Sequence, residues 1–145
     1  MKLNRSGFTL LELIIVIFLI TLMIGLSAVF FANTLPSGRF SATTRELAAT
    51  IRQARHLAQL NGEKQVITID MDSRSYGIES RGEKKLPAGI DITVIDPQAG
   101  DITRGKYHMT FYPAGSTVGG TIVLRNNTRV ANINIDPVAG AVIIK

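Results

Sequence analysis

An uninterrupted apolar run from Leu13 to Ala32 constrains this chain more than any other feature. The run contains no charged side chain, and only Thr21, Gly25 and Ser27 interrupt its large apolar residues. As an α-helix it would be roughly 30 Å long, which is enough to cross the hydrocarbon core of a bilayer. The sequence therefore predicts a membrane-spanning or bundle-forming helix near the N-terminus.

Charged residues before this run predict its orientation. Lys2 and Arg5 precede the run, so we expect a cytoplasmic N-terminus and export of the remainder. Glu12 stands at the start of the run, where a carboxylate near membrane depth costs a few kcal/mol and indicates a function. The alternatives are a plain anchor, which does not need Glu12, and a cleaved signal peptide, whose apolar core would span only about 7–15 residues.

The residues around the start of the run carry a family resemblance. The segment Lys2 to Gly7, followed by Phe8 to Leu13, resembles the class III leader of type IV pilins and type II secretion pseudopilins. The resemblance implies cleavage after Gly7 by prepilin peptidase and N-methylation of the new terminus at Phe8. The ammonium of Phe8 would lie one helical turn from Glu12, so the two charges could share a face. In a filament the ammonium of a neighbouring subunit could be the partner, and Glu12 would set axial register.

Composition limits the remaining function classes. Formal charge is +5, and loss of Lys2 and Arg5 would leave 14 basic and 11 acidic side chains, or +3. This mild excess weakly favours acidic partners or an anionic lipid surface, and it lacks the dense basic patch typical of nucleic-acid binding. The chain has no cysteine, which excludes a disulfide framework, a cysteine zinc site and a thiol nucleophile.

A second helical pattern follows a breaker cluster at residues 33–38, where Pro36 is expected to disrupt or kink the helix. Thr43 and Glu46 fit a capping box, and Asn61-Gly62 is a C-terminal stop signal. Apolar residues recur at helical spacing and predict one buried stripe: Phe40, Leu47, Ile51, Ala54 and Ala58. Four residues off this stripe form either a solvated face or a contact with a partner pseudopilin: Arg45, Arg52, Arg55 and His56.

From Gln65 the apolar period changes to two, which predicts strands. Six or seven short strands are expected, with a charged loop at 81–85, a second loop at 96–105 and an Asn126-Asn127 turn. No helices interleave, so the strands should pair antiparallel. The predicted class is α+β, with a long apolar N-terminal helix that continues into an amphipathic helix packed on an antiparallel sheet or sandwich. The predicted organisation is a leader at 1–7, a filament-core helix at 8–32, an amphipathic helix at 33–62 and a periplasmic β domain at 63–145.

The second half of the chain sharpens the resemblance. It is similar to the GspH/FimT family of minor pseudopilins and minor pilins in five segments: Leu47-Ala48, Ile51 to Arg55, Val66 to Asp70, Phe111 to Ser116 and Ile133 to Gly140. The leader is the more specific signal, because the domain segments are largely strand and turn patterns.

No catalytic constellation or cofactor site is predicted. His56 and His108 have no other His or Cys at metal-ligand spacing. The stretch from Gly115 to Gly119 lacks the pattern of a nucleophile elbow or a phosphate loop. Asp96 and Asp101 could bind calcium with loop carbonyls, although their spacing is sparse. The sequon Asn126-Asn127-Thr128 is better interpreted as a hairpin turn.

The resemblance implies a structural role rather than an enzymatic one. The first hypothesis is an H-type minor pseudopilin at or near the tip of the type II secretion pseudopilus, anchored in the bacterial inner membrane with a periplasmic domain. Its implied partners are other pseudopilins, prepilin peptidase and the inner-membrane assembly platform. The alternative is a FimT-like minor type IV pilin that binds DNA, with Arg125 and Arg129 as weak contacts. The apolar C-terminal segment lacks the Arg-rich tail of such DNA binders.

Overall fold

A computed structural model gives the fold of the 145-residue chain. It describes the backbone of residues 8–145 and the side chains of residues 8–27 and 38–145, so the leader residues 1–7, including Gly7, lie outside the described residues. The chain divides into two compact units, Met1–Gly38 and Arg39–Lys145. Helix α1 (Leu10–Asn61) contributes to both units.

The bounds of α1 differ from the predicted ones. The helix includes residues 33–38, so the predicted disruption at Pro36 does not end it. A proline removes one N–H donor, and the flanking helical bonds can continue on both sides. The predicted capping box is also wrong, because Thr43 lies inside α1 and its hydroxyl donates to the Arg39 carbonyl at 2.9 Å. The predicted stop is confirmed, since α1 ends at Asn61 and Gly62 has a φ of 66°.

The part of α1 that belongs to the second unit buries one face. The predicted apolar stripe is confirmed, because Phe40 is 4% exposed and the other four members are fully buried. Three threonines on this helix are buried beside the stripe. Their hydroxyls donate to the carbonyl four residues earlier, which satisfies them without a partner from the sheet: Thr43, Thr44 and Thr50.

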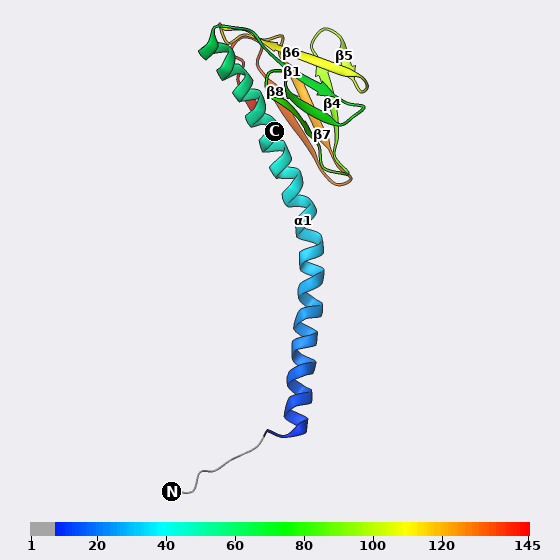
Figure 1. The fold of residues 1–145 in the computed structure, drawn as a ribbon. Coiled ribbons are helices and arrows are strands. Elements are labelled where there is room, and N and C mark those ends of the chain that lie inside the picture. Colours follow the sequence, from blue (N-terminus) through cyan, green and yellow to red (C-terminus); the bar gives the residue numbers. More distant parts are fainter. Residues whose placement is uncertain (1–7) are drawn as a thin grey trace, which may run out of the picture. The chain divides into compact units, whose positions relative to one another are not determined.

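The described part of the chain forms two antiparallel sheets (Figure 1). The first sheet has the order β3-β2-β1-β6, and the second sheet has the order β5-β4-β7-β8-β9. The strands are β1 (Gln65–Asp70), β2 (Ser75–Ile78), β3 (Gly82–Lys85), β4 (Asp91–Asp96), β5 (Gly100–Ile102), β6 (Lys106–Phe111), β7 (Gly120–Arg125), β8 (Val130–Ile135) and β9 (Val142–Ile144). The α+β class and the antiparallel pairing are thus confirmed.

Two strands were expected to be loops. The charged segment predicted as a loop at 81–85 contains β3, and the loop predicted at 96–105 contains β5. Each is the outermost strand of its sheet, and all four residues of β3 are exposed. Edge strands commonly carry charged residues that block further pairing. The expected six or seven strands were identified by alternating apolar residues, and edge strands of this kind lack that alternation.

One core joins α1 to both sheets. The apolar stripe of α1 packs with the inward rows of the first and second sheets in a single cluster of buried side chains. The fully buried residues of this cluster include Leu47 and Ile51 from α1, Ile67 and Met109 from the first sheet, and Leu124 and Ile133 from the second. The helix therefore covers the apolar faces of both sheets, whose exposure to water would be unfavourable.

A short repeated turn closes two hairpins on either side of β7. The β4–β5 hairpin carries Asp96-Pro97-Gln98-Ala99-Gly100, and the β8–β9 hairpin carries Asp136-Pro137-Val138-Ala139-Gly140. In each turn the aspartate Oδ1 accepts the N–H groups two and three residues later, at 2.8 and 2.8 Å for Asp96 and 2.9 and 2.7 Å for Asp136. Both hairpins are therefore closed by the same Asp-Pro-x-Ala-Gly turn, in which the aspartate side chain bonds the backbone N–H groups that follow it.

Gly119 and Gly120 pack against these two turns. A Cβ on Gly119 would lie 2.9 Å from Cβ of Pro137, and one on Gly120 would lie 3.0 Å from the Ile95 carbonyl oxygen. Their φ angles of 78° and 134° also favour glycine. The start of β7 therefore fits beside the two hairpins only without side chains.

Candidate assembly site

The first unit presents an apolar helical surface. The 18 residues of α1 from Leu10 to Ser27 have a mean hydropathy of 2.7 and none of them is buried. The exposed fractions of their large apolar side chains range from 43% for Val16 to 78% for Leu10. This segment is about 27 Å long as a helix, close to the thickness of a bilayer core. It is consistent with a single-pass membrane anchor.

Thr9 and Glu12 form the N-terminal cap of this helix. The backbone N–H of Glu12 donates to Thr9 Oγ1 at 3.2 Å, and the N–H of Leu13 donates to the Thr9 carbonyl at 3.2 Å. Thr9 is thus the N-cap and Glu12 the third helical residue, the spacing of a capping box. The capping box was predicted at the wrong threonine, although the same Thr-x-x-Glu pattern occurs here before the apolar run.

The charge of Glu12 has no compensation within its own apolar segment. No Lys or Arg occurs between Phe8 and Ala32, and Glu12 is the only charged side chain of that stretch. Its place in the first turn favours a carboxylate, because the N–H groups there carry partial positive charge. In an apolar bundle a full countercharge would have to come from a nearby amino terminus or from another chain. Phe8, the expected new terminus, is 76% exposed.

The polar interruptions of the apolar run are satisfied internally. The Thr21 hydroxyl donates to the Ile17 carbonyl at 2.8 Å, and the Ser27 hydroxyl donates to the Met23 carbonyl at 2.8 Å. Each hydroxyl finds an acceptor on its own helix, so neither needs water or a partner chain. Glu12 is consequently the polar group that distinguishes this segment from a simple anchor.

The basic face of α1 in the second unit is only partly solvated. Arg45 and His56 are exposed, but Arg52 Nη2 donates to the Val142 carbonyl at 3.2 Å. Arg55 is half-buried, its Nε is buried without a hydrogen-bond partner among the described residues, and a Cβ added to Gly140 would lie 3.0 Å from its Cδ. Arg52 thus links the helix to the β domain by a hydrogen bond and Arg55 lies against the turn at Gly140, which the sequence did not predict.

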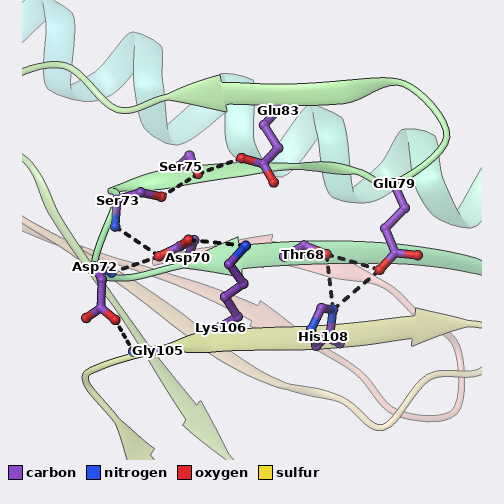
Figure 2. A network of polar contacts seen from close by, with 10 residues as sticks. All are labelled: Thr68, Asp70, Asp72, Ser73, Ser75, Glu79, Glu83, Gly105, Lys106 and His108. Atoms are coloured by element: carbon purple, nitrogen blue, oxygen red, sulfur yellow. Dashed lines mark hydrogen bonds and ion pairs between the residues drawn. The ribbon is translucent and has the colours of Figure 1, made fainter.

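Figure 2 shows a polar network of the first sheet. His108 Nδ1 lies 3.1 Å from Thr68 Oγ1 and 3.4 Å from Glu79 Oε1. Both contacts use the same ring nitrogen, and Thr68 also bonds Glu79 directly at 3.3 Å. A nucleophile–histidine–acid relay needs the two different ring nitrogens, so this arrangement cannot act as a catalytic triad.

A second group of polar contacts in Figure 2 organises the β1–β2 turn. Asp70 Oδ1 accepts the N–H groups of Asp72 and Ser73 at 3.0 and 2.9 Å, and Lys106 Nζ lies 3.7 Å from Asp70 Oδ2. The Ser73 N–H, followed by other hydrogen bonds and the Lys106 charge, lowers the pKa of Asp70 despite its burial. These contacts stabilise the turn between β1 and β2.

Asp96 was one of the two aspartates expected to bind calcium. Both of its carboxylate oxygens already accept hydrogen bonds within the protein. Its Oδ1 accepts two turn N–H groups and its Oδ2 accepts a 2.6 Å hydrogen bond from Tyr107 Oη. Asp101 is exposed in β5. Among the described residues, no group of three His, Cys, Asp or Glu side chains has a geometry suited to a metal ion.

Arg125 and Arg129 have different surroundings. Both are exposed, but Arg125 lies directly opposite Asp91 across the β4–β7 pair. Arg129 instead lines a groove that also contains Arg45. The predicted Asn126 turn is confirmed, because Asn126 Oδ1 accepts the N–H groups of Thr128 and Arg129 at 3.0 and 2.7 Å.

Residues 2–28 match the family described as the prokaryotic N-terminal methylation motif. This motif is typical of type IV pilin-like proteins. Gly7, Phe8 and Glu12 all lie within the matched residues, whereas the β domain lies outside them. No curated protein and no solved structure shows significant similarity to this chain.

Proposed function

We propose that this chain is a structural minor pseudopilin of the type II secretion system. It is processed after Gly7, methylated at Phe8 and assembled through its apolar helix at or near the tip of a short periplasmic fibre. There it aids initiation of the fibre that exports folded proteins across the outer membrane. Its partners are other pseudopilins, prepilin peptidase and the inner-membrane assembly platform.

The observation that supports this proposal is the capped start of the apolar helix. The methylation motif leads directly into the apolar part of α1, where Glu12 is the sole charged residue up to Ala32 and lies at the third helical position after the Thr9 cap. Proteins that carry this motif are typically structural and not enzymatic. An uncompensated carboxylate on an apolar helical segment with no buried residue favours association with another chain that supplies an ammonium.

Cysteine crosslinking tests the proposal cleanly because the natural chain has no cysteine. Ile17→Cys places one thiol on the apolar helix, where Ile17 is 55% exposed. Crosslinking in envelopes that contain the secretion machinery should capture another subunit with the same N-terminal motif. Gln98→Cys, in an exposed turn of the β domain, is the matched control. Capture of no pilin-like subunit by Ile17→Cys would reject assembly through this helix.

The second candidate is a FimT-like minor type IV pilin that binds DNA, supported only by the exposure of Arg125 and Arg129. The position of Asp91 opposite Arg125 weakens it, because a carboxylate there repels phosphates. Salt-dependent binding of the full chain to DNA, lost when both arginines are replaced by alanine, would favour this candidate. Binding that is absent, or unaffected by the substitutions, would remove it.

A further inference from the structure

Strand β9 leaves one edge of the second sheet unpaired in the described part of the chain. Asn132 and Lys145 exchange both backbone hydrogen bonds, at 2.9 and 2.8 Å. Because bonded pairs alternate along an antiparallel ladder, the backbone groups of Val142 and Ile144 point away from β8. Arg52 already covers the Val142 carbonyl at 3.2 Å. The N–H and carbonyl of Ile144 therefore remain available for pairing.

A groove of about 510 Å³ lies beside Ile144, between the second sheet and the first turns of α1 in this unit. Its apolar lining combines buried Phe40 and Ala131 with the more exposed Val130 and Ile144, at 54% and 40%. A free backbone N–H and carbonyl next to an apolar groove suit the addition of a strand, because main-chain bonds supply affinity and pockets select side chains.

The charged residues that line the groove indicate that its ligand is negatively charged. Arg45 and Arg129 both line it and both are exposed. Neither forms a salt bridge with an acidic side chain in residues 8–27 and 38–145. No acidic side chain lines the groove. A ligand with carboxylates would thus meet two unneutralised guanidinium groups, which suit planar carboxylates.

We propose that this groove binds an extended acidic peptide segment of a partner protein. The segment pairs with Ile144 through its backbone, places β-branched or aliphatic side chains against Phe40 and Val130, and contacts Arg45 and Arg129 through carboxylates. The proposal concerns the second unit, Arg39–Lys145, alone and does not depend on the secretion role proposed above.

Two other occupants fit the groove less well. A second copy of this chain, paired edge to edge, would bring the arginines of both copies toward the same seam and incur like-charge repulsion. A nucleic acid would use the arginines, but it has no strand backbone to pair with Ile144. Its affinity also comes mainly from many phosphate contacts, for which two arginines are few.

The test uses the full chain in detergent micelles and a display library of random linear heptapeptides. Enriched peptides should combine Asp or Glu with Val, Ile or Leu. For a synthetic copy of an enriched peptide, the double variant Arg45→Glu/Arg129→Glu should bind about tenfold more weakly. Arg81→Glu, which reverses an exposed charge on the β2–β3 turn, is the matched control and should leave the affinity for the peptide unchanged.

Backbone pairing is tested with the natural protein. Two peptides are compared, one N-methylated at its odd-numbered residues and one at its even-numbered residues. One of them should bind about tenfold more weakly and the other should bind almost normally, because only one of these two sets of N–H groups faces β9. Absence of acidic enrichment, affinity insensitive to the arginine reversals, or equal tolerance of both methylated registers would each overturn the proposal. Arginine-dependent binding of a single-stranded oligonucleotide without peptide binding, or self-association lost on the same reversals, would also overturn it.

Discussion

The Tyr107 hydroxyl donates a 2.6 Å hydrogen bond to Oδ2 of Asp96, which connects β6 of the first sheet to β4 of the second. The other carboxylate oxygen of Asp96 accepts the N–H groups of Gln98 and Ala99 and shapes the turn between β4 and β5. The hydrogen bond from Tyr107, followed by the two turn N–H groups, holds the pKa of Asp96 below its ordinary value. Burial, followed by the contact with Asp96, raises the pKa of Tyr107 above its ordinary value.

The first prediction concerns acid stability. Because the folded-state pKa of Asp96 is lowered, its stabilising contribution is fully present above the unfolded value of about 3.9. That contribution is lost as pH falls through the lower folded pKa. Tyr107→Phe removes the largest cause of the shift, so it should lower Tm near neutral pH by a few degrees. The difference from the natural chain should shrink in acid.

Thermal denaturation from neutral to strongly acidic pH measures this difference. Tyr112→Phe is the control, since Tyr112 is 47% exposed and should leave the acid profile unchanged. A Tyr107→Phe defect of the same size at every pH would show that Asp96 does not carry the effect.

The second prediction concerns Glu12. Glu12→Gln retains the shape of the side chain and removes its charge, while Glu12→Ala removes both. Both variants should still insert into membranes, because the apolar run is intact, but both should incorporate poorly into fibres since the countercharge loses its partner. Thr21→Val is the control, because Thr21 bonds only to its own helix. Normal co-purification of Glu12→Gln with assembled fibres would argue against a role for the charge.

The third prediction concerns the Gly119-Gly120 pair. Gly120→Ala places a Cβ 3.0 Å from the Ile95 carbonyl at a φ of 134°. The substitution should reduce the free energy of unfolding by about 1–3 kcal/mol. Gly38→Ala is the control, because a Cβ there meets no atom within 4 Å and its helical backbone tolerates alanine. Urea denaturation compares the two, and equal stabilities would show that the two hairpins leave more room than the structure indicates.

The fourth prediction concerns the shared core. Phe111 is fully buried at the end of β6, and Phe111→Ala should lower the free energy of unfolding by about 3–5 kcal/mol because it leaves a cavity. The neighbouring Tyr112→Ala, at an exposed position, should have a much smaller effect. Chemical denaturation of both variants measures the contrast. Similar losses would place Phe111 outside the cooperative core.

Much of the fold follows from patterns that burial enforces. The apolar stripe of α1 and the interior strands each carry a row of buried apolar side chains, so the helical and alternating periods could be read from residues such as Ile51 and Ile69. Strands β3 and β5 could not be predicted from such a pattern, because they lie at the edges of their sheets, where neither face has to be apolar. Their pairing depends on contacts with β2 and β4 that leave no local pattern.

The candidate site was predictable where a local motif specifies it. Glu12 and the start of the helix followed from the order of leader, glycine and apolar run. The Thr9 cap was missed, although its Thr-x-x-Glu signal was present. The matching turns at Asp96 and Asp136 could also have been found as an internal repeat. The groove beside Ile144 could not, because it brings α1 and β8 together from distant parts of the chain.

Mass spectrometry of the mature N-terminus tests the central claim most directly. The chain purified from membranes of a cell with prepilin peptidase should begin at Phe8, carry one methyl group on its amino nitrogen, and retain Glu12 as its fifth residue. A chain that begins at Met1, or one that begins at another residue without methylation, would contradict assembly as a pilin-like subunit.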